Sequence, residues 1–296
     1  MNLGIWTNSE DSTANYLCSK RPFNVNIYRF DSDRKNFFSL EYDSNNVLEY
    51  IDVLWYRRPF ENSNTPDSLS EKIAFSETEE ALWNYLFQIP KEKWINFPTD
   101  NWYADKKIRQ LRLAEKCGLN IPEWILTNES EQAEKFLKKF EWDCVIKPIN
   151  CGYFIDKDDV YHIYTNEVKG NIKEFSIIEN CPTFFQKRIS KAYDVRTIYL
   201  NANVLFIGLY NGSLDVRRNE MKNIKYKIID APENIKESYI KMMKYEGLKF
   251  CTSDFVVDEN NKWYFLENNP NGQWVWMDKD LNGKVVEYFF ENIWDV

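Results

Sequence analysis

The sequence predicts a mixed α/β fold with α+β character, because two kinds of pattern share the chain. Strand-like and helix-like segments alternate over about the first ninety residues, which is typical of a small α/β domain. Further along, strand-like runs follow one another, and two of them form a hairpin pattern at residues 253–269. A length of 296 residues suits one large domain or two to three small ones.

The amino-terminal elements follow from apolar runs and their spacing. Three runs rich in β-branched and aromatic residues predict strands at residues 2–6, 25–30 and 53–58. The polar residues 62–68 predict a loop, and residues 70–87 have the apolar spacing of a helix. We expect a domain boundary near residues 95–98, where a proline follows a short apolar run.

The remaining elements alternate between helices and strands. Residues 101–117 have a helical pattern, and Gly118 is expected to end that helix as its C-cap. The next elements are predicted in chain order as a helix at 129–140, a strand at 144–148, a loop at 149–159, strands at 183–189, 194–200 and 204–210, and a helix at 234–245. The hairpin then follows, and the turn at residues 269–272 stops its second strand.

Composition excludes several classes of function. A net charge of −8 and a pI near 5.0 argue against a generic nucleic-acid binder, because such affinity comes from phosphate neutralisation by Lys and Arg. No apolar run is long enough to span a bilayer, and residues 1–6 lack the features of a signal peptide. We therefore expect a cytoplasmic protein with neither nucleic-acid nor membrane partners.

The number and positions of the cysteines and the histidine restrict the kinds of catalytic and metal site that we expect. Six cysteines with irregular spacing and no Cys-x-x-Cys pair favour reduced, mostly buried thiols over a zinc site or disulfide framework. The single histidine, His162, lies in a strand-like stretch without a nearby nucleophile motif, so we expect it to be structural. Chemistry must then come from carboxylates, Lys, Arg and a bound metal ion.

The hairpin pattern predicts a metal site. Pairing Asp258 with Trp263 places Asp254 directly opposite Glu267, and Asn269 shares their face. Facing carboxylates repel unless a cation lies between them, and an all-oxygen set suits Mg²⁺. The alternative is a solvated acidic hairpin end.

Two lysines stand where they could bind phosphate. Lys107 lies near the start of the helix predicted at 101–117, and Lys147 ends a mostly apolar strand just before Pro148. A lysine in such a strand needs an anionic partner, which a nucleotide phosphate would supply. Either lysine could instead be a solvated surface charge.

Two further regions are candidates for ligand contacts. The polar residues after Phe185 could present backbone groups to an adenine, or could be a plain edge strand; they are Gln186, Lys187, Arg188 and Ile189. Two Asp-Val-Arg segments contain Asp194 with Arg196, and Asp215 with Arg217. Arginine forks bind carboxylates and phosphates, although Asp and Arg two residues apart can also form surface ion pairs worth little.

In this order along the chain, these motifs resemble those of the ATP-grasp superfamily from about residue 96 to the C-terminus. The matching segments are Asp-Lys-Lys107, Gly118-Leu-Asn-Ile-Pro, Val-Ile-Lys147-Pro, Phe-Gln186, Asp194-Val-Arg196, Ser-Asp254-Phe-Val-Val-Asp and Phe-Leu-Glu267-Asn-Asn269-Pro-Asn-Gly-Gln-Trp. The Trp55-Tyr-Arg-Arg-Pro segment and the Asn-Pro-Asn-Gly-Gln-Trp ending are most similar to the microviridin-type ligases that mature graspetides. A broader branch of the superfamily contains glutamate ligases.

The resemblance implies roles residue by residue. Asp254, Glu267 and Asn269 would bind Mg²⁺. Lys107, with Lys106 as an alternative, and Lys147 would contact ATP phosphates, while residues 186–189 would hold adenine. Arg196 and Arg217, with Asp194 and Asp215 beside them, would face the acyl phosphate and the acceptor.

The resemblance also implies an architecture and an activity. The expected domains are a pre-ATP-grasp α/β domain at 1–95, a central subdomain at 96–185 and a C-terminal subdomain with the magnesium site at 186–296. The expected enzyme is an ATP-dependent ligase that activates Asp or Glu side chains of a ribosomal precursor peptide, with a leader and an acidic core, and forms intramolecular esters or amides. A homodimer is also implied. The alternatives are a ligase adding free glutamate or another amino acid, and a non-catalytic ATP-sensing module.

Overall fold

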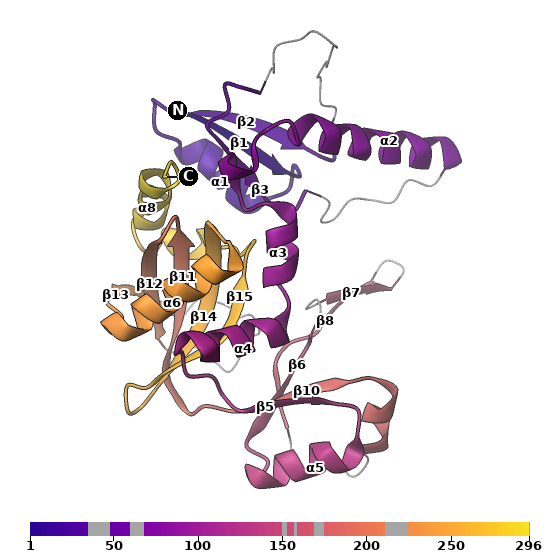
Figure 1. Ribbon diagram of the computed structural model, residues 1–296, viewed down its shortest axis with the longest axis vertical. Coiled ribbons are helices and arrows are strands. Elements are labelled where there is room, and N and C mark those ends of the chain that lie inside the picture. The colour runs from indigo at the N-terminus through magenta and orange to yellow at the C-terminus, as the bar shows by residue number, and fades with distance from the viewer. Residues whose placement is uncertain are drawn as a thin grey trace.

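The computed structural model describes residues 1–34, 48–59, 68–149, 153–156, 159–168, 175–210 and 224–295 (Figure 1). Most of the loop predicted at 62–68 lies outside these ranges, as do Asp215 and Arg217. The described strands form three larger sheets and one two-stranded hairpin. Along the long axis of the molecule in Figure 1, the carboxyl-terminal sheet lies between the amino-terminal sheet and the sheet formed from the middle of the chain.

The amino-terminal sheet is parallel and has the strand order β2-β1-β3-β4. Its strands are β1 (Asn2–Thr7), β2 (Asn26–Asp31), β3 (Val53–Tyr56) and β4 (Trp94–Ile95), with helices α1 (Ser12–Lys20) and α2 (Leu69–Leu86) and a 3₁₀ turn at Lys91–Lys93. Asp11 caps α1, and a capping box of Ser68 and Glu71 begins α2. The three predicted strands and the predicted helix are confirmed, although β3 ends at Tyr56 and leaves Arg57 and Arg58 beyond it.

The single helix predicted at residues 101–117 is wrong, because two helices occupy this region. Helix α3 (Pro98–Ala104) begins with a proline in its first turn, and α4 (Lys107–Cys117) ends at Gly118, whose φ of 98° confirms the predicted C-cap. Between them the backbone of Lys106 is extended, with φ −81° and ψ 101°. Neither Gly nor Pro marks this break, so the apolar spacing runs through it.

The middle sheet is antiparallel in the order β5-β10-β6-β9. It comprises β5 (Trp124–Thr127), β10 (Thr183–Lys187), β6 (Cys144–Lys147) and β9 (Asn166–Glu167), with helix α5 (Ser130–Lys139) and the 3₁₀ helix η2 (Phe175–Asn180). Ala133 and Leu137 of α5 share a buried cluster with Cys144 and Phe185, so α5 covers one face. The opposite face carries Lys147 and Gln186.

The loop predicted at residues 149–159 is corrected by the structure in part. It contains β7 (Tyr153–Asp156) and the first residue of β8 (Asp159–His162), which pair as an antiparallel hairpin. The run Tyr153-Phe-Ile is short but made of residues that favour strands, and this outweighs the polar residues around it.

The carboxyl-terminal sheet is antiparallel in the order β13-β12-β11-β14-β15. Its strands are β11 (Lys191–Leu200), β12 (Asn203–Tyr210), β13 (Lys225–Ile229), β14 (Phe250–Asp258) and β15 (Trp263–Asn269), and its helices are α6 (Glu233–Glu246), α7 (Val275–Asp278) and α8 (Lys284–Asn292). The predicted strands and helix here are confirmed, whereas β13 and, in the middle sheet, β5 were not predicted. Both are short strands whose side chains are mostly half-buried or exposed.

Two buried clusters cover the two faces of this sheet. On one face, residues of α4 and α6 such as Leu111 and Tyr239 pack against Phe255 and Val195. On the other, α7, α8 and side chains of the amino-terminal sheet pack against strand residues such as Ile198. The second face therefore joins two sheets, and the polar residues at its open end form the site described below.

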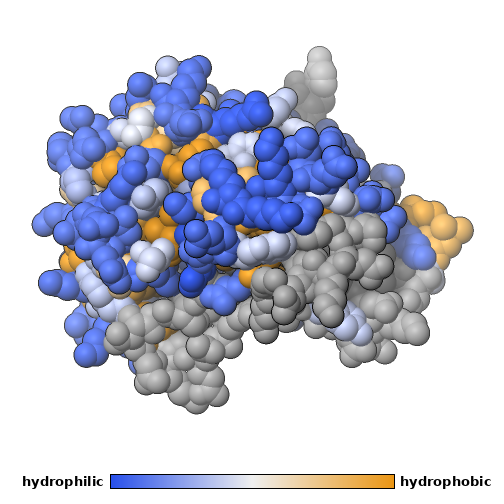
Figure 2. Space-filling view, turned by 90° about the horizontal axis from the view of Figure 1, so that it is seen from below, coloured by the Kyte–Doolittle hydropathy of each residue, from blue (hydrophilic) through white to orange (hydrophobic). Residues whose placement is uncertain are grey.

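The face seen in Figure 2 is mostly hydrophilic, with smaller hydrophobic areas between charged side chains. None of the described helices is long and apolar enough to cross a membrane. Among the described cysteines, Cys117, Cys144 and Cys251 are buried and none forms a disulfide, as the sequence predicted.

Candidate active site

The hairpin of β14 and β15 brings the predicted carboxylates together. Asp254 pairs with Glu267, and Ser253 with Asn268. The predicted pairing of Asp258 with Trp263 is wrong, because Trp263 lies opposite Val257. An irregularity beyond Asp254 absorbs the one-residue difference, since Phe255 pairs with Phe265 and Leu266 is left as an extra residue.

Asn269 lies at the end of β15, opposite Thr252. Thr252 and Asp254 are two residues apart on β14 and share a face, so Asn269 belongs to the same end of the sheet as the two carboxylates. The chain then turns, and the N–H of Gly272 donates to the carbonyl of Asn269 at 3.0 Å. The turn therefore begins directly at the third candidate ligand.

Each carboxylate is paired with a cation from another element. Lys107, the first residue of α4, has its Nζ 2.5 Å from Oε2 of Glu267. The Nη1 atom of Arg196 donates to both oxygens of Asp254, at 2.7 and 2.8 Å. Both cationic side chains are 13% exposed, against 33% for Glu267 and 32% for Asp254. The carboxylates therefore keep an accessible side while the cations behind them are largely covered.

The donor set fits Mg²⁺. Two carboxylates and the amide oxygen of Asn269 are hard oxygen ligands, and bound phosphates and water would complete a coordination shell. Among the described residues no group of three or more His, Cys, Asp or Glu gathers, so this donor set consists of the two carboxylates and one amide. In the structure, Lys107 and Arg196 form ion pairs with the two carboxylates that would hold the ion.

Asp105, at the break between α3 and α4, lies in the same charged neighbourhood. Desolvation by the surrounding protein raises the pKa of Asp105, and the charge of Glu267 acts in the same direction. Lys106, Lys107 and Arg58 oppose this shift without cancelling it. The region therefore combines several cations with carboxylates, and cationic side chains of this kind bind anions such as phosphate.

The middle sheet places Lys147 and Gln186 on one face. Phe184 pairs with Lys147 and Gln186 with Val145, and residues two apart on a strand point the same way. Gln186 is only 1% exposed, and its Nε2 donor has no hydrogen-bond partner among the described residues. A buried amide donor without a partner costs free energy, so this side chain suits a ligand that accepts a hydrogen bond.

The three residues after Gln186 are placed differently. Lys187 follows Gln186 on β10 and points to the opposite face, where its Nζ lies 5.4 Å from the centre of the Phe140 ring. The Nε atom of Arg188 lies 2.5 Å from Oδ1 of Asp143, and both are exposed. Ile189 is half-buried. The side chain of Lys187 thus points away from the face of Gln186. Arg188 lies beyond the end of β10 and also reaches Glu167, which pairs with Val145 on the face of Gln186.

Of the residues expected to face the acceptor, Asp194 and Arg196 share a face of β11. Asp194 lies 2.5 Å from Nζ of Lys191, and Arg196 binds Asp254. Asp215 and Arg217 lie outside the described residues. The structure therefore brings Lys107, Arg196, Asp254, Glu267 and Asn269 to one end of the carboxyl-terminal sheet.

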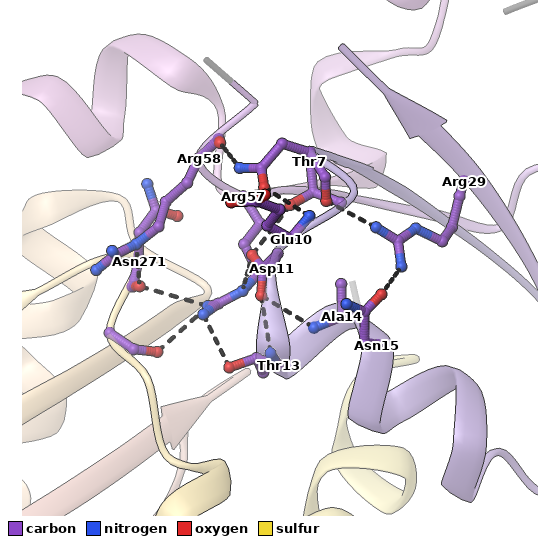
Figure 3. Close-up of polar contacts among 12 residues, drawn as sticks. Thr7, Glu10, Asp11, Thr13, Ala14, Asn15, Arg29, Arg57, Arg58 and Asn271 are labelled. Carbon is purple, nitrogen blue, oxygen red and sulfur yellow. Dashed lines mark hydrogen bonds and ion pairs between the residues drawn. The ribbon is translucent and has the colours of Figure 1, made fainter. Parts of the chain in front are cut away.

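Sequence reasoning missed the residues that support this centre. Gln110 of α4 binds the backbone of Asn268, accepting from its N–H at 2.9 Å and donating to its carbonyl at 3.0 Å. Arg57 and Arg58 donate to the turn after Asn269 (Figure 3). The two arginines after an apolar strand were a visible signal, whereas nothing in the sequence distinguishes Gln110 from a surface glutamine.

Several solved structures of other proteins share the fold of this chain. No family model matches the sequence, and no curated protein matches it either. Among solved structures, the macrocyclase MdnC from Microcystis aeruginosa MRC, bound with precursor peptide MdnA, has a TM-score of 0.77 at 21% identity, over 98% of this chain and 100% of its own. A RiPP-associated ATP-grasp ligase from Chryseobacterium gregarium, in complex with ADP and a leader and core peptide, has a TM-score of 0.75 at 21% identity, over 99% and 95% of the two chains.

A more distant likeness extends the comparison to another kind of ligase. D-alanine–D-alanine ligase from Bacillus anthracis, complexed with ATP, has a TM-score of 0.54 at 14% identity, over 99% of this chain and 96% of its own. Together these likenesses show that the chain has the ATP-grasp fold over nearly its whole length, which confirms the predicted fold.

Proposed function

We propose that the protein is an ATP-dependent carboxylate ligase that acts on side chains of a ribosomal precursor peptide. The observation that carries this proposal is the pairing of Asp254 with Glu267 at the end of a hairpin, each with its own cation. The peptide substrate is supported by the neighbours, because MdnC and the Chryseobacterium ligase are each described in complex with a precursor, or with a leader and core peptide.

Asp254, Glu267 and Asn269 would hold Mg²⁺, which when bound neutralises the phosphoryl group being transferred. Around it the chain supplies fixed charge. Lys107 is largely covered and reaches Glu267, so a nucleotide phosphate beside that carboxylate would meet its Nζ. Arg196 reaches the same centre through Asp254, from the side of the sheet that also carries Asp194.

Lys147 and Gln186 are proposed to hold the nucleotide from the middle sheet. They share the face that α5 leaves uncovered, and the Nε2 donor of Gln186 is suited to a ring nitrogen of adenine. Of residues 186–189, proposed to hold adenine, Gln186 would contribute its side chain. Lys187 and Ile189 would contribute backbone groups, and Arg188 would lie at the edge of the face that carries Gln186.

The reaction has two steps. In the first, a substrate carboxylate oxygen attacks the terminal phosphorus of ATP, and the bond from that phosphorus to the bridging oxygen breaks. The products of this step are an acyl phosphate and ADP. A hydroxyl or amine of the same peptide then attacks the acyl carbon, phosphate leaves, and the proton of the nucleophile passes to a nearby carboxylate or to phosphate. Arg196 would bind the negative oxygens that appear in both steps.

Several finer features belong to the same proposal. Intramolecular esters or amides would join acidic core residues to Ser, Thr or Lys. The working unit would be a homodimer, and the chain would divide into domains at residues 1–95, 96–185 and 186–296. The described part of the chain has a sheet in each of these ranges, but β10 of the middle sheet ends at Lys187 and so crosses the boundary between residues 185 and 186.

The proposal is tested by trapping the acyl phosphate. The purified protein, ATP and Mg²⁺ are incubated with acidic peptides encoded beside the gene, in the presence of hydroxylamine. Conversion of peptide carboxylates to hydroxamates, together with ADP release that depends on the peptide, is the expected result. ATP binding without peptide-dependent ADP release would contradict ligase activity and favour a sensing module, while incorporation of free glutamate would indicate the amino-acid ligase.

A further inference from the structure

The turn that follows the candidate metal ligands is held from the amino-terminal sheet. The Nη1 atom of Arg57 donates to the carbonyls of Asn271 at 3.4 Å and Gly272 at 3.3 Å. The Nε atom of Arg58 donates to the same carbonyl of Asn271 at 3.0 Å. Figure 3 shows both guanidinium groups directed at this turn, more than two hundred residues away in the sequence.

Arg57 is fully buried and its position is determined from several sides. Its Nε lies 2.7 Å from Oδ2 of Asp11, and its Nη2 donates to Oγ1 of Thr13 at 3.0 Å. Asp11 also accepts from the backbone of Thr13 and Ala14 and from the hydroxyl of Thr7. A buried arginine with this many partners has little freedom, so the atoms it offers to the turn are fixed in space.

Arg58 adds a second, less buried contact. Its backbone has a positive φ of 45°, which side-chain-bearing residues adopt at a cost, and its carbonyl accepts from Nδ2 of Asn8 at 2.9 Å. On the far side of the turn, Nδ2 of Asn101 lies 3.4 Å from Oδ1 of Asn271. The turn is thus bound by the amino-terminal sheet and by α3.

This turn also contacts residues of the candidate metal centre. A Cβ added to Gly272 would lie 1.6 Å from Oγ1 of Thr252 and 3.0 Å from Nη2 of Arg196, so the backbone of Gly272 packs directly on both residues. The Nη2 atom of Arg196 also donates to the carbonyl of Gln273 at 3.2 Å, while its Nη1 holds Asp254. A shift of this turn would move Arg196, and with it the carboxylate.

We infer that Arg57 and Arg58 are positioning residues for the metal centre, acting through the backbone of Asn271 and Gly272. This inference rests on the proposed function, because it assigns the centre to Mg²⁺. The role is a mechanical one: the amino-terminal sheet sets the place of the turn, and the turn sets the place of Asn269 and Arg196. Supporting residues of this kind commonly change metal affinity although they never touch the ion.

The experiment compares three variants with the wild-type protein. Arg58→Ala removes one donor from a half-buried side chain, and Arg57→Lys keeps the charge facing Asp11 but loses the fork that reaches the turn. Arg21→Ala is the control, because Arg21 donates to the carbonyl of Val25, just before β2, and has no described contact with the turn or with Arg58. Two quantities are measured: hydrogen exchange of residues 268–274 without metal, and Mn²⁺ binding with ADP by electron paramagnetic resonance.

The expected result is faster exchange of residues 268–274 in both Arg57→Lys and Arg58→Ala, with Mn²⁺ affinity lower by on the order of tenfold. Arg21→Ala should keep wild-type values of both, even where its melting temperature falls. Unchanged exchange in both test variants, or equal effects in the control, would overturn the inference. Failure of the wild-type protein to bind Mn²⁺ with ADP would instead contradict the metal assignment, and the exchange data would still decide whether the arginines hold the turn.

Discussion

Both carboxylate oxygens of Asp254 accept hydrogen bonds from a single atom, Nη1 of Arg196. Arg196 lies on the neighbouring strand β11, directly opposite Asp254 on β14. The pair sits beside Glu267 and Lys107, so two carboxylates and two cations alternate at the end of one sheet. Such an arrangement orients both carboxylates while leaving about a third of each side chain exposed to a ligand.

Replacing Glu267 with Gln should abolish ligase turnover while preserving the fold. The substitution keeps the shape but removes the negative charge, and the lost contact with Lys107 costs about 1 kcal/mol or less because Glu267 is partly exposed. We expect kcat to fall by more than about 100-fold, beyond the effect of residues that only support metal ligands. Glu259→Gln, at the exposed hairpin turn, is the control, and full activity of Glu267→Gln would refute the metal assignment.

Lys107 and Lys106 are expected to differ sharply although they are adjacent. Lys107 reaches Glu267, whereas Nζ of Lys106 lies 4.3 Å from the centre of the exposed Trp102 ring. Lys107→Ala should raise the KM for ATP by about 10- to 100-fold, as for loss of a charge-assisted hydrogen bond. Lys106→Ala should change it by less than about threefold. The reverse order in steady-state kinetics would transfer the phosphate contact to Lys106.

Gln186→Met should have opposite effects on the free and the ATP-bound protein. The buried Nε2 donor of Gln186 lacks a partner among the described residues, which costs about 1–3 kcal/mol, so removing it should leave the free protein equally or more stable. The same change removes the donor offered to adenine. Thermal unfolding with and without ATP should therefore show an unchanged or higher melting temperature alone and a smaller shift with ATP. A wild-type shift would place adenine elsewhere.

Stability at acidic pH should depend on Asp11. Burial acts to raise the pKa of Asp11, but the charge of Arg57 and hydrogen bonds from Ala14 and Thr7 outweigh it, so the pKa is lowered in the folded protein. A lowered folded pKa contributes stability that is present above the unfolded value of about 3.9 and is lost as the pH falls through the folded value. Urea unfolding from pH 6 to pH 3 should show a steeper loss for the wild-type protein than for Asp11→Asn. Parallel curves would contradict this role.

The hairpin site could be predicted because its signals are local. Alternation on β14 and β15, with a turn directly after Asn269, is enough to bring Asp254 opposite Glu267. The extra residue Leu266 could not be predicted from this pattern, since a bulge shifts the register without changing the composition of either strand. The extra residue explains why the predicted pairing is correct at Asp254 and Glu267 but wrong at Trp263.

Other features depend on contacts between distant segments. The break at Asp105 and Lys106 has no local signal, although it makes Lys107 the first residue of a helix. Arg57 and the turn at Asn271 are joined only in the folded chain, so no window of sequence reveals their contact. By contrast, strand alternation alone implies that the side chains of Gln186 and Lys187 point to opposite faces. This alternation is enough to predict different roles for the two side chains.

The proposed activity joins a peptide carboxylate to a nucleophile of the same peptide at the expense of ATP. Its most direct test is intact-mass spectrometry of the small acidic peptides encoded beside the gene, after incubation with the purified protein, ATP and Mg²⁺. We predict loss of the mass of one water per linkage, dependent on ATP and absent with Glu267→Gln. A gain in mass equal to an added amino acid, or no change in any peptide while ATP is bound, would contradict the proposal.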